Sequence, residues 1–518
     1  MTRPDSRIST LSVLATLVLL AAGLLTALWL YRGAPELARA PGWFYQAVNK
    51  GSFDMLLVAA AAAALPYLVR GSFRWARPRP WAAGVCIVVG SILLQLAAGL
   101  VARQGVRGWT ERFYVGHGEF TAYSRGIPDA VGLLRDYEGL AARNQLGLYG
   151  PSKPPGTYAV YLAINRSAHT STLETLLAPL AEIVARDRDI QPADRVLVAW
   201  TILFLGLCAA FTTLPLFWLG RMLFASHAES ARVYTYPAWL FATAPVTNVI
   251  TVHLDSTLFP LLSATCTALC ACSAQLATGP DGLAAESGGM HQQSAAVAMA
   301  AGLVGMFAVY CSYGNLPILV TGAIVIVALL FQLRTEAGLT ARPLQAYWPP
   351  LVGLVTGASA MLLFLCVVLD WQPVVGYLRG VGYHSRWRPN LPSAWRHGLA
   401  FVEFGLFAGP PLMLAFLASS GLSMLGVVRS LGTYLRTRSH APLPYGVAVL
   451  TLATTAVICA ITIVLGTPEA ARLWLFMLPW VCCAAAAMFT RKDLDAPFIA
   501  LLTGQVVLTF FVKNYLVW

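Results

Sequence analysis

Membrane-length apolar segments follow one another along most of this chain, separated by short polar connections. A helix that crosses a bilayer needs about 20 mostly apolar residues. By that criterion we expect about thirteen spans, near 8–30, 53–70, 82–102, 196–219, 233–251, 254–274, 294–313, 315–334, 348–370, 398–425, 444–465, 472–490 and 496–514. The pattern therefore predicts an all-α polytopic membrane protein.

One long polar stretch, 103–195, interrupts this pattern and divides the chain into three parts. Transmembrane helices in 1–102 precede it, and a transmembrane bundle in 196–518 follows it. Inside the insert, apolar spacing predicts two amphipathic helices, at 128–141 with Val131, Leu134 and Tyr137 on one face, and at 172–184. The prolines at 151, 154 and 155 lie between these helices, and we expect them to hold an extended segment that then reverses.

Composition supports the membrane class, because 58% of residues are hydrophobic and only 11% are charged. The formal net charge is +12, and its Lys and Arg residues concentrate in alternate loops. Such residues are retained on the cytoplasmic side. This distribution places the N-terminus inside and puts the insert, the turn 251–255, the loop 371–397, the turn 466–472 and the C-terminus outside. The charge thus indicates topology, and we do not expect nucleic acid as a partner.

Several ionisable residues occur on the predicted outer side. Asp255 and His253 lie in a turn too short to hold them far from the bilayer, where charged groups are costly. They are candidates to bind an acceptor or a divalent cation, although Asp255 could also cap the helix that begins near residue 256. Lys153 is fixed by the proline turn and is a candidate phosphate ligand, or alternatively a contact with lipid headgroups.

The loop 371–397 is basic although it is predicted to be external. It carries Arg379, Arg386, Arg388 and Arg396 and no carboxylate. Guanidinium groups bind phosphate with paired hydrogen bonds, so a lipid phosphate or pyrophosphate is one candidate ligand. Contact with anionic headgroups is the alternative.

Three short segments resemble those of the C-type (GT-C superfamily) integral-membrane glycosyltransferases, which use polyprenyl-phosphate-linked sugars. The first is an acidic residue early in a large external loop, here Glu119 in G-H-G-E-F; the second is a K-P-P-G turn, here 153–156. The third is 466–479, which contains Glu469 and Arg472 and is similar to an E-x-x-R-x-W-x-F-x-x-P segment of bacterial members. Here the loop follows the third span and its acid is Glu, whereas many relatives have the loop after the first span and an Asp.

The resemblance implies an inverting transfer of a sugar from a polyprenyl-phosphate donor to a glycan, lipid or protein acceptor, at the outer face of a bacterial cytoplasmic membrane. Such a transfer needs a carboxylate that orients or deprotonates the acceptor and cations that stabilise the departing phosphate. Whether a metal is required stays open. We assign Glu119 as the base, with His117 beside it and Asp129 as an alternative base. The donor phosphate is assigned to Lys153, Arg386, Arg388 and Arg472. Asp255 and His253 are assigned to the acceptor or a metal, and Glu469 to the orientation of Arg472.

Three other interpretations remain. A lipid or glycan transporter or flippase would be expected to contain ionisable or Gly/Pro-broken segments near the middle of the bilayer. A glycan polymerase or ligase would use chemistry close to that of the transferase. A membrane scaffold without catalysis would leave the outer set of charged residues unexplained, and Glu469 with Arg472 would then be an intrahelical ion pair.

Overall fold

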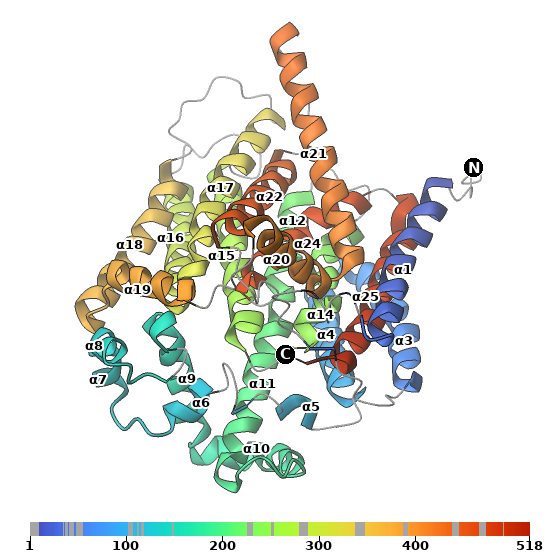
Figure 1. The fold of residues 1–518 in the computed structure, drawn as a ribbon. Coiled ribbons are helices and arrows are strands. Elements are labelled where there is room, and N and C mark those ends of the chain that lie inside the picture. The colour runs from blue at the N-terminus through green and yellow to red at the C-terminus, as the bar shows by residue number, and fades with distance from the viewer. Residues whose placement is uncertain are drawn as a thin grey trace.

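The computed structural model describes residues 10–34, 36, 40, 46–47, 55–101, 107–110, 113–114, 119–147, 150–224, 231–249, 253–278, 288–336, 348–386, 392–437, 445–465, 473–490 and 492–517. In this part of the chain, eleven helical segments are long and apolar enough to cross a membrane. The prediction of an all-α polytopic membrane protein is confirmed, and Figure 1 shows the long helices gathered in one bundle.

The candidate spans lie in α1 (Thr10–Tyr31), α3 (Met55–Trp75), α4 (Pro80–Val101), α11 with α12 (Arg195–Phe211 and Thr213–Phe224), α15 (Leu254–Thr278), α16 (Gly288–Cys311), α17 (Pro317–Glu336), α18 (Trp348–Leu369), α21 (Pro410–Thr437), α22 (Tyr445–Leu465) and α25 (Asp495–Tyr515). A two-residue antiparallel bridge joins β1 (Gln46–Ala47) to β2 (Leu516–Val517).

Two of the predicted spans, 233–251 and 472–490, contain no helix of membrane length. The first contains α13 (Tyr236–Thr243) and α14 (Pro245–Val249), and the second contains η7 (Leu475–Met477), α24 (Leu478–Ala486) and η8 (Ala487–Phe489). Every residue of α13, α14 and α24 is buried. Because other helices shield them from lipid, these segments can be short or interrupted, and the count falls from about thirteen to eleven.

A junction between two interrupted helices lies inside the bundle. One break separates α13 from α14 at Ala244, and the other separates α20 (Ser393–Ala408) from α21 at Gly409, whose φ is +103°. Gln505 of α25 connects them, because its Nε2 donates to Ala408 O at 3.0 Å and its Oε1 accepts from Thr243 Oγ1 at 2.8 Å. The side chain therefore satisfies backbone and hydroxyl groups at both breaks, as the interior of a membrane protein requires. We call this group of residues the Gln505 junction.

The insert forms a group of short helices at one end of the bundle (Figure 1). They are α5 (Arg107–Thr110), α6 (Glu119–Ser124), α7 (Ala130–Arg135), α8 (Tyr137–Ala142), α9 (Pro155–Ala168) and α10 (Ser171–Val184), with the 3-10 helices η2 (Gly150–Ser152) and η3 (Pro192–Asp194).

The helix predicted at 172–184 is confirmed as α10, whereas the helix at 128–141 and the extended proline segment need correction. The helix predicted at 128–141 breaks at Asp136 into α7 and α8, and it buries Leu133 and Tyr137 while Val131 is exposed. The proline segment is also not extended before a reversal. It forms η2, and Pro155 then begins α9, since proline is well tolerated at the first position of a helix.

The predicted loop 371–397 is mostly helical. It contains α19 (Pro373–Arg386) and the first part of α20. The chain leaves α18 through Asp370, whose φ of +50° is left-handed, and Trp371 then packs against Tyr310 with ring centroids 5.2 Å apart. This corner directs α19 back over the insert rather than into solvent.

Candidate functional site at the insert end of the bundle

The proline segment 150–156 is the centre of the candidate site. Tyr137 Oη lies 2.9 Å from Gly150 O and 2.8 Å from Lys153 O, and it donates between the two carbonyls. Burial raises the pKa of Tyr137 well above its usual range, so the phenol stays a neutral donor. The backbone around Lys153 is thus held from inside the insert.

The end of α16 fixes the same segment from the other side. Thr157 Oγ1 donates to Cys311 O at 2.7 Å. Gly156 lies so close to α16 that a Cβ atom at this position would be 2.3 Å from Tyr310 O. Only glycine fits there, which explains the last residue of the K-P-P-G sequence in physical terms.

Lys153 pairs with Asp255, and this contact joins the insert to the bundle. Their Nζ and Oδ2 atoms are 3.6 Å apart, and the two side chains are 6% and 3% exposed. Asp255 is the second residue of α15, so it lies within the first helical turn and does not occupy the cap position. A carboxylate in the first turn interacts favourably with the helix dipole. Two residues that were singled out separately in the sequence are therefore neighbours.

His253 precedes α15 and is also buried. Its carbonyl accepts from the hydroxyls of Ser256 at 3.0 Å and Thr257 at 2.9 Å, which fixes the start of the helix. The side chains of His253 and Asp255 offer a nitrogen and an oxygen atom as metal ligands, two residues apart in the chain. Among the described residues, however, no group of three or more His, Cys, Asp or Glu side chains is arranged to hold a metal ion.

Helix α19 covers the proline segment. Arg379 Nε donates to Pro151 O at 3.1 Å, and its guanidinium forms an ion pair with Glu138 of α8. The guanidinium carbon also lies 5.9 Å from the centre of the Tyr137 ring. The expectation that the arginines of 371–397 lack a carboxylate partner is wrong for Arg379, because its partner comes from the insert.

The remaining predicted residues fall into three groups. Asp129 is exposed and caps α7, where its Oδ1 accepts from Gly132 N at 2.9 Å. Glu119 begins α6 and Arg386 ends α19, and the structure describes these two residues by their backbone only. The predicted site residues outside the described part of the chain are His117, Arg388, Glu469 and Arg472.

A buried lysine that the sequence analysis did not select lies at the end of α25. Lys513 is 7% exposed, and its Nζ lies 3.4 Å from Val249 O, at the end of α14. The signal was present in the sequence, since Lys513 is the only cation in the predicted span 496–514. A lysine within a span is costly unless it is paired or functional.

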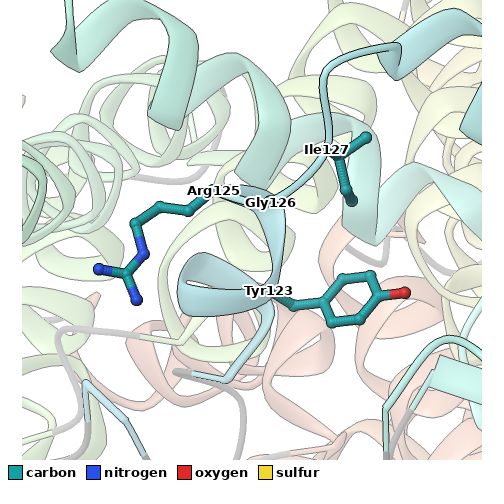
Figure 2. A pocket seen from close by; sticks show the side chains of 4 residues that line it. All are labelled: Tyr123, Arg125, Gly126 and Ile127. Carbon is teal, nitrogen blue, oxygen red and sulfur yellow. The ribbon is translucent and has the colours of Figure 1, made fainter.

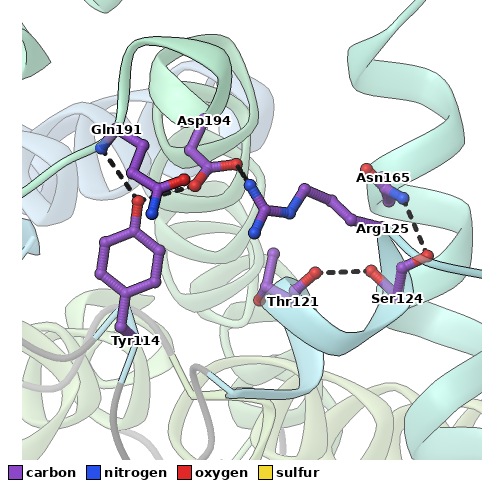
Figure 3. A network of polar contacts seen from close by, with 7 residues as sticks. All are labelled: Tyr114, Thr121, Ser124, Arg125, Asn165, Gln191 and Asp194. Carbon is purple, nitrogen blue, oxygen red and sulfur yellow. Dashed lines mark hydrogen bonds and ion pairs between the residues drawn. The ribbon is translucent and has the colours of Figure 1, made fainter.

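A second polar network ties the two ends of the insert together (Figure 3). Tyr114 Oη donates to Asp194 Oδ2 at 2.6 Å and accepts from Gln191 N at 3.0 Å, while Arg125 pairs with the other oxygen of Asp194. Burial, followed by the hydrogen bond to Asp194, raises the pKa of Tyr114 to about 12. Tyr114, Arg125, Gln191 and Asp194 all bond within this network, so we interpret this part of it as structural.

A surface hollow of about 470 Å³ lies beside this network, lined by Tyr123, Arg125, Gly126 and Ile127 (Figure 2). Its only charged lining residue, Arg125, is engaged by Asp194. Neither Lys153 nor Asp255 lines it. We therefore place the candidate site at the Lys153–Asp255 pair and not at the hollow.

No family model matches the sequence, and no curated protein matches it. Among solved structures, the apo oligosaccharyltransferase of Archaeoglobus fulgidus is similar over 83% of this chain and 56% of that chain, with a TM-score of 0.45 and 13% identity. This chain thus spans little more than half the length of that structure. A likeness at this level supports no assignment of family or activity.

Proposed function

We propose that this protein is a membrane glycosyltransferase that moves a sugar from a polyprenyl-phosphate donor to an acceptor at the outer face of a bacterial cytoplasmic membrane. The observation that carries the proposal is the buried Lys153–Asp255 pair between the K-P-P-G segment and α15. A buried ion pair is a weak source of stability, because desolvation offsets most of its Coulomb energy. Its presence where a loop meets a span favours a chemical role.

The chemistry assigns each group a task. The acceptor hydroxyl attacks the anomeric carbon of the sugar, a new glycosidic C–O bond forms, and the bond to the lipid phosphate breaks with its electron pair. Glu119 takes the acceptor proton, assisted by His117, and Asp129 is the alternative base. Lys153, Arg386, Arg388 and Arg472 stabilise the charge that develops on the departing phosphate, and Glu469 orients Arg472. Asp255 and His253 would hold the acceptor, or would contribute two of the ligands of a divalent cation.

The test is sugar transfer from a polyprenyl-phosphate donor by purified protein in vesicles. Glu119→Gln keeps the shape of the side chain but removes the basic oxygen, so transfer should fall at least about a hundredfold. Glu182→Gln is the matched control, because Glu182 is an exposed acid of α10 and its loss should leave transfer unchanged. Retention of more than about a tenth of the rate in the Glu119 variant would assign the base to Asp129 or Asp255 instead.

One observation favours a lipid or glycan transporter as the second candidate. The Gln505 junction joins two interrupted helices, and discontinuous helices near the bilayer centre occur at the substrate sites of transporters. The junction also has a structural explanation, since Gln505 satisfies the groups at the breaks. A transporter would move a labelled lipid-linked sugar between leaflets without forming a new glycosidic bond, and analysis of the products in the same vesicles separates the two functions.

A further inference from the structure

Helix α19 has an apolar face that no described part of the protein covers. Val374, Val375, Leu378 and Val381 follow helical spacing along it, and all four are exposed. Val374 is 69% exposed and Leu378 is 63% exposed. These residues lie on a different face of α19 from Arg379, which makes the polar contacts of the helix.

The opposite face of α19 is built for close contact with the insert. Gly376, Arg379 and Gly380 are spaced so that they lie on neighbouring turns of one face. A Cβ atom at Gly376 would lie 2.1 Å from Tyr313 Oη, and one at Gly380 would lie 3.3 Å from Ser152 O. Arg379 adds its bonds to Pro151 O and Glu138. The inner face of α19 therefore contacts Tyr313 after α16, Glu138 of α8, and Pro151 and Ser152 next to Lys153.

The apolar face continues the exposed surface of α18. That span exposes Leu363, Phe364 and Val367 in its last two turns, and Val367 is 73% exposed. Membrane lipid is the medium that suits such a surface on a span. The corner at Asp370 joins the two helices, and Figure 1 shows α19 lying across the end of α18. An apolar face at the end of a lipid-exposed span lies at the depth of the bilayer surface.

We infer that α19 is an interfacial helix whose apolar face, Val374, Val375, Leu378 and Val381, inserts into the boundary between headgroups and acyl chains. The partner is the phospholipid surface of the bilayer that holds α18. Besides Arg379, which pairs with Glu138, the segment 371–397 carries three further arginines and no carboxylate in the sequence, which suits anionic headgroups. Because the inner face of α19 holds residues 150–153, the membrane surface sets the position of Lys153. This inference does not depend on sugar transfer.

The first test is photo-crosslinking in phosphatidylcholine vesicles that contain phosphatidylglycerol. Benzoylphenylalanine replaces Leu378 in one protein, Leu363 of α18 in a second as the lipid reference, and Arg188, an exposed residue of the insert, in a third as the water reference. We expect phospholipid adducts by mass spectrometry at 378 and 363 and none at 188. Adducts at 378 with a second copy of the chain, or no lipid adduct at 378 while 363 forms one, would overturn the inference.

The second test measures the link between α19 and Lys153. Leu378→Asp places a charge in the apolar face and should release the helix from lipid, while Leu378→Met conserves the apolar contact. Hydrogen exchange of the backbone at 150–158 should accelerate at least about threefold in the Asp variant and stay at the native rate in the Met variant. Equal exchange in both variants would show that lipid contact does not position the segment. Neither readout requires transfer, so failure here is distinct from failure of the proposed function.

Discussion

The Gln505 junction and the Lys153–Asp255 pair are both buried and both join segments distant in sequence, but they differ in chemistry. At the junction, neutral groups meet at 2.8 and 3.0 Å, and each bond satisfies a group at a helix break. At the pair, two ionisable groups are 3.6 Å apart. Folding explains the first arrangement fully. For the second, apolar side chains would stabilise the fold as well or better.

This difference suggests how structural polar groups can be distinguished from functional ones inside a membrane protein. Breaking a neutral network that satisfies backbone groups should lower the stability of the protein. Activity should then fall only as far as the fraction of folded protein falls. A charged pair that the backbone does not require should affect activity even when stability is restored. Five variants follow, each with the measurement that checks it, from the largest expected effect to the smallest.

The largest effect is expected from Asp255→Asn, which removes the carboxylate beside Lys153. Breaking a buried pair typically costs about 3–5 kcal/mol of unfolding free energy. Sugar transfer should also fall at least about a hundredfold if the pair belongs to the reacting centre. Thermal unfolding in detergent and the vesicle transfer assay measure the two effects.

The double variant Lys153→Met with Asp255→Leu separates these effects. It removes both charges together, so most of the stability should return while transfer stays lost. Transfer within about tenfold of wild type in this variant would show that the pair is structural.

Gln505→Leu should produce a loss of stability without a specific loss of activity. It leaves Ala408 O without its side-chain donor, at a cost of about 1–3 kcal/mol, whereas the Thr243 hydroxyl keeps its bond to Trp239 O at 2.9 Å. Gln293→Leu is the control, because Gln293 is an exposed glutamine of α16. Transfer per folded molecule should stay within about twofold of wild type. A hundredfold loss in folded protein would instead place the Gln505 junction in the functional site.

Gly156→Ala tests the contact between the proline segment and α16. Its Cβ would meet Tyr310 O, and overpacking of this kind costs about 1–3 kcal/mol. Gly71→Ala in α3 has no neighbour within 4 Å and should stabilise its helix by up to about 1 kcal/mol. Equal melting temperatures for the two variants would contradict the close approach of α9 to α16.

Asp129→Ala should have the smallest effect. Loss of the cap of α7 costs about 1 kcal/mol, and an exposed cap should not matter for transfer. Asp129→Ser retains a capping oxygen and should recover the stability. A large loss of transfer in both variants would assign the base to Asp129 and not to Glu119.

The helical membrane class could be predicted from the sequence because a long apolar run has few other stable structures. The sequence also indicated Lys153 and Asp255 one by one, since each is an ionisable residue in a constrained turn. It could not show their pairing, because about a hundred residues separate them in the chain and only tertiary packing joins them. Glu138 was not selected for a similar reason, as its partner Arg379 lies on a helix far along the chain.

The interrupted helices show another limit of the sequence pattern. Pro245 and Gly409-Pro410 lie inside apolar runs and are break signals, but hydropathy alone reads both runs as continuous spans. The breaks form because Gln505 and neighbouring hydroxyls satisfy the backbone, and that compensation comes from other helices. Helix α19 was expected as a loop because its glycines and arginines obscured a short amphipathic pattern.

The contact between α1 and α25 has a consequence for biosynthesis. Gly23 approaches Gly504 so closely that a Cβ atom at Gly23 would lie 2.7 Å from the Cα of Gly504, and Tyr31 packs edge-on against Phe511 and Tyr515. Nearly the whole described chain is translated between these two helices. Helix α1 therefore lacks its main partner until α25 leaves the ribosome and docks beside it. Ribosome stalling before α25 would leave the Gly23 surface open, and quality-control proteases would meet an unfinished bundle whose first helix still lacks its neighbour.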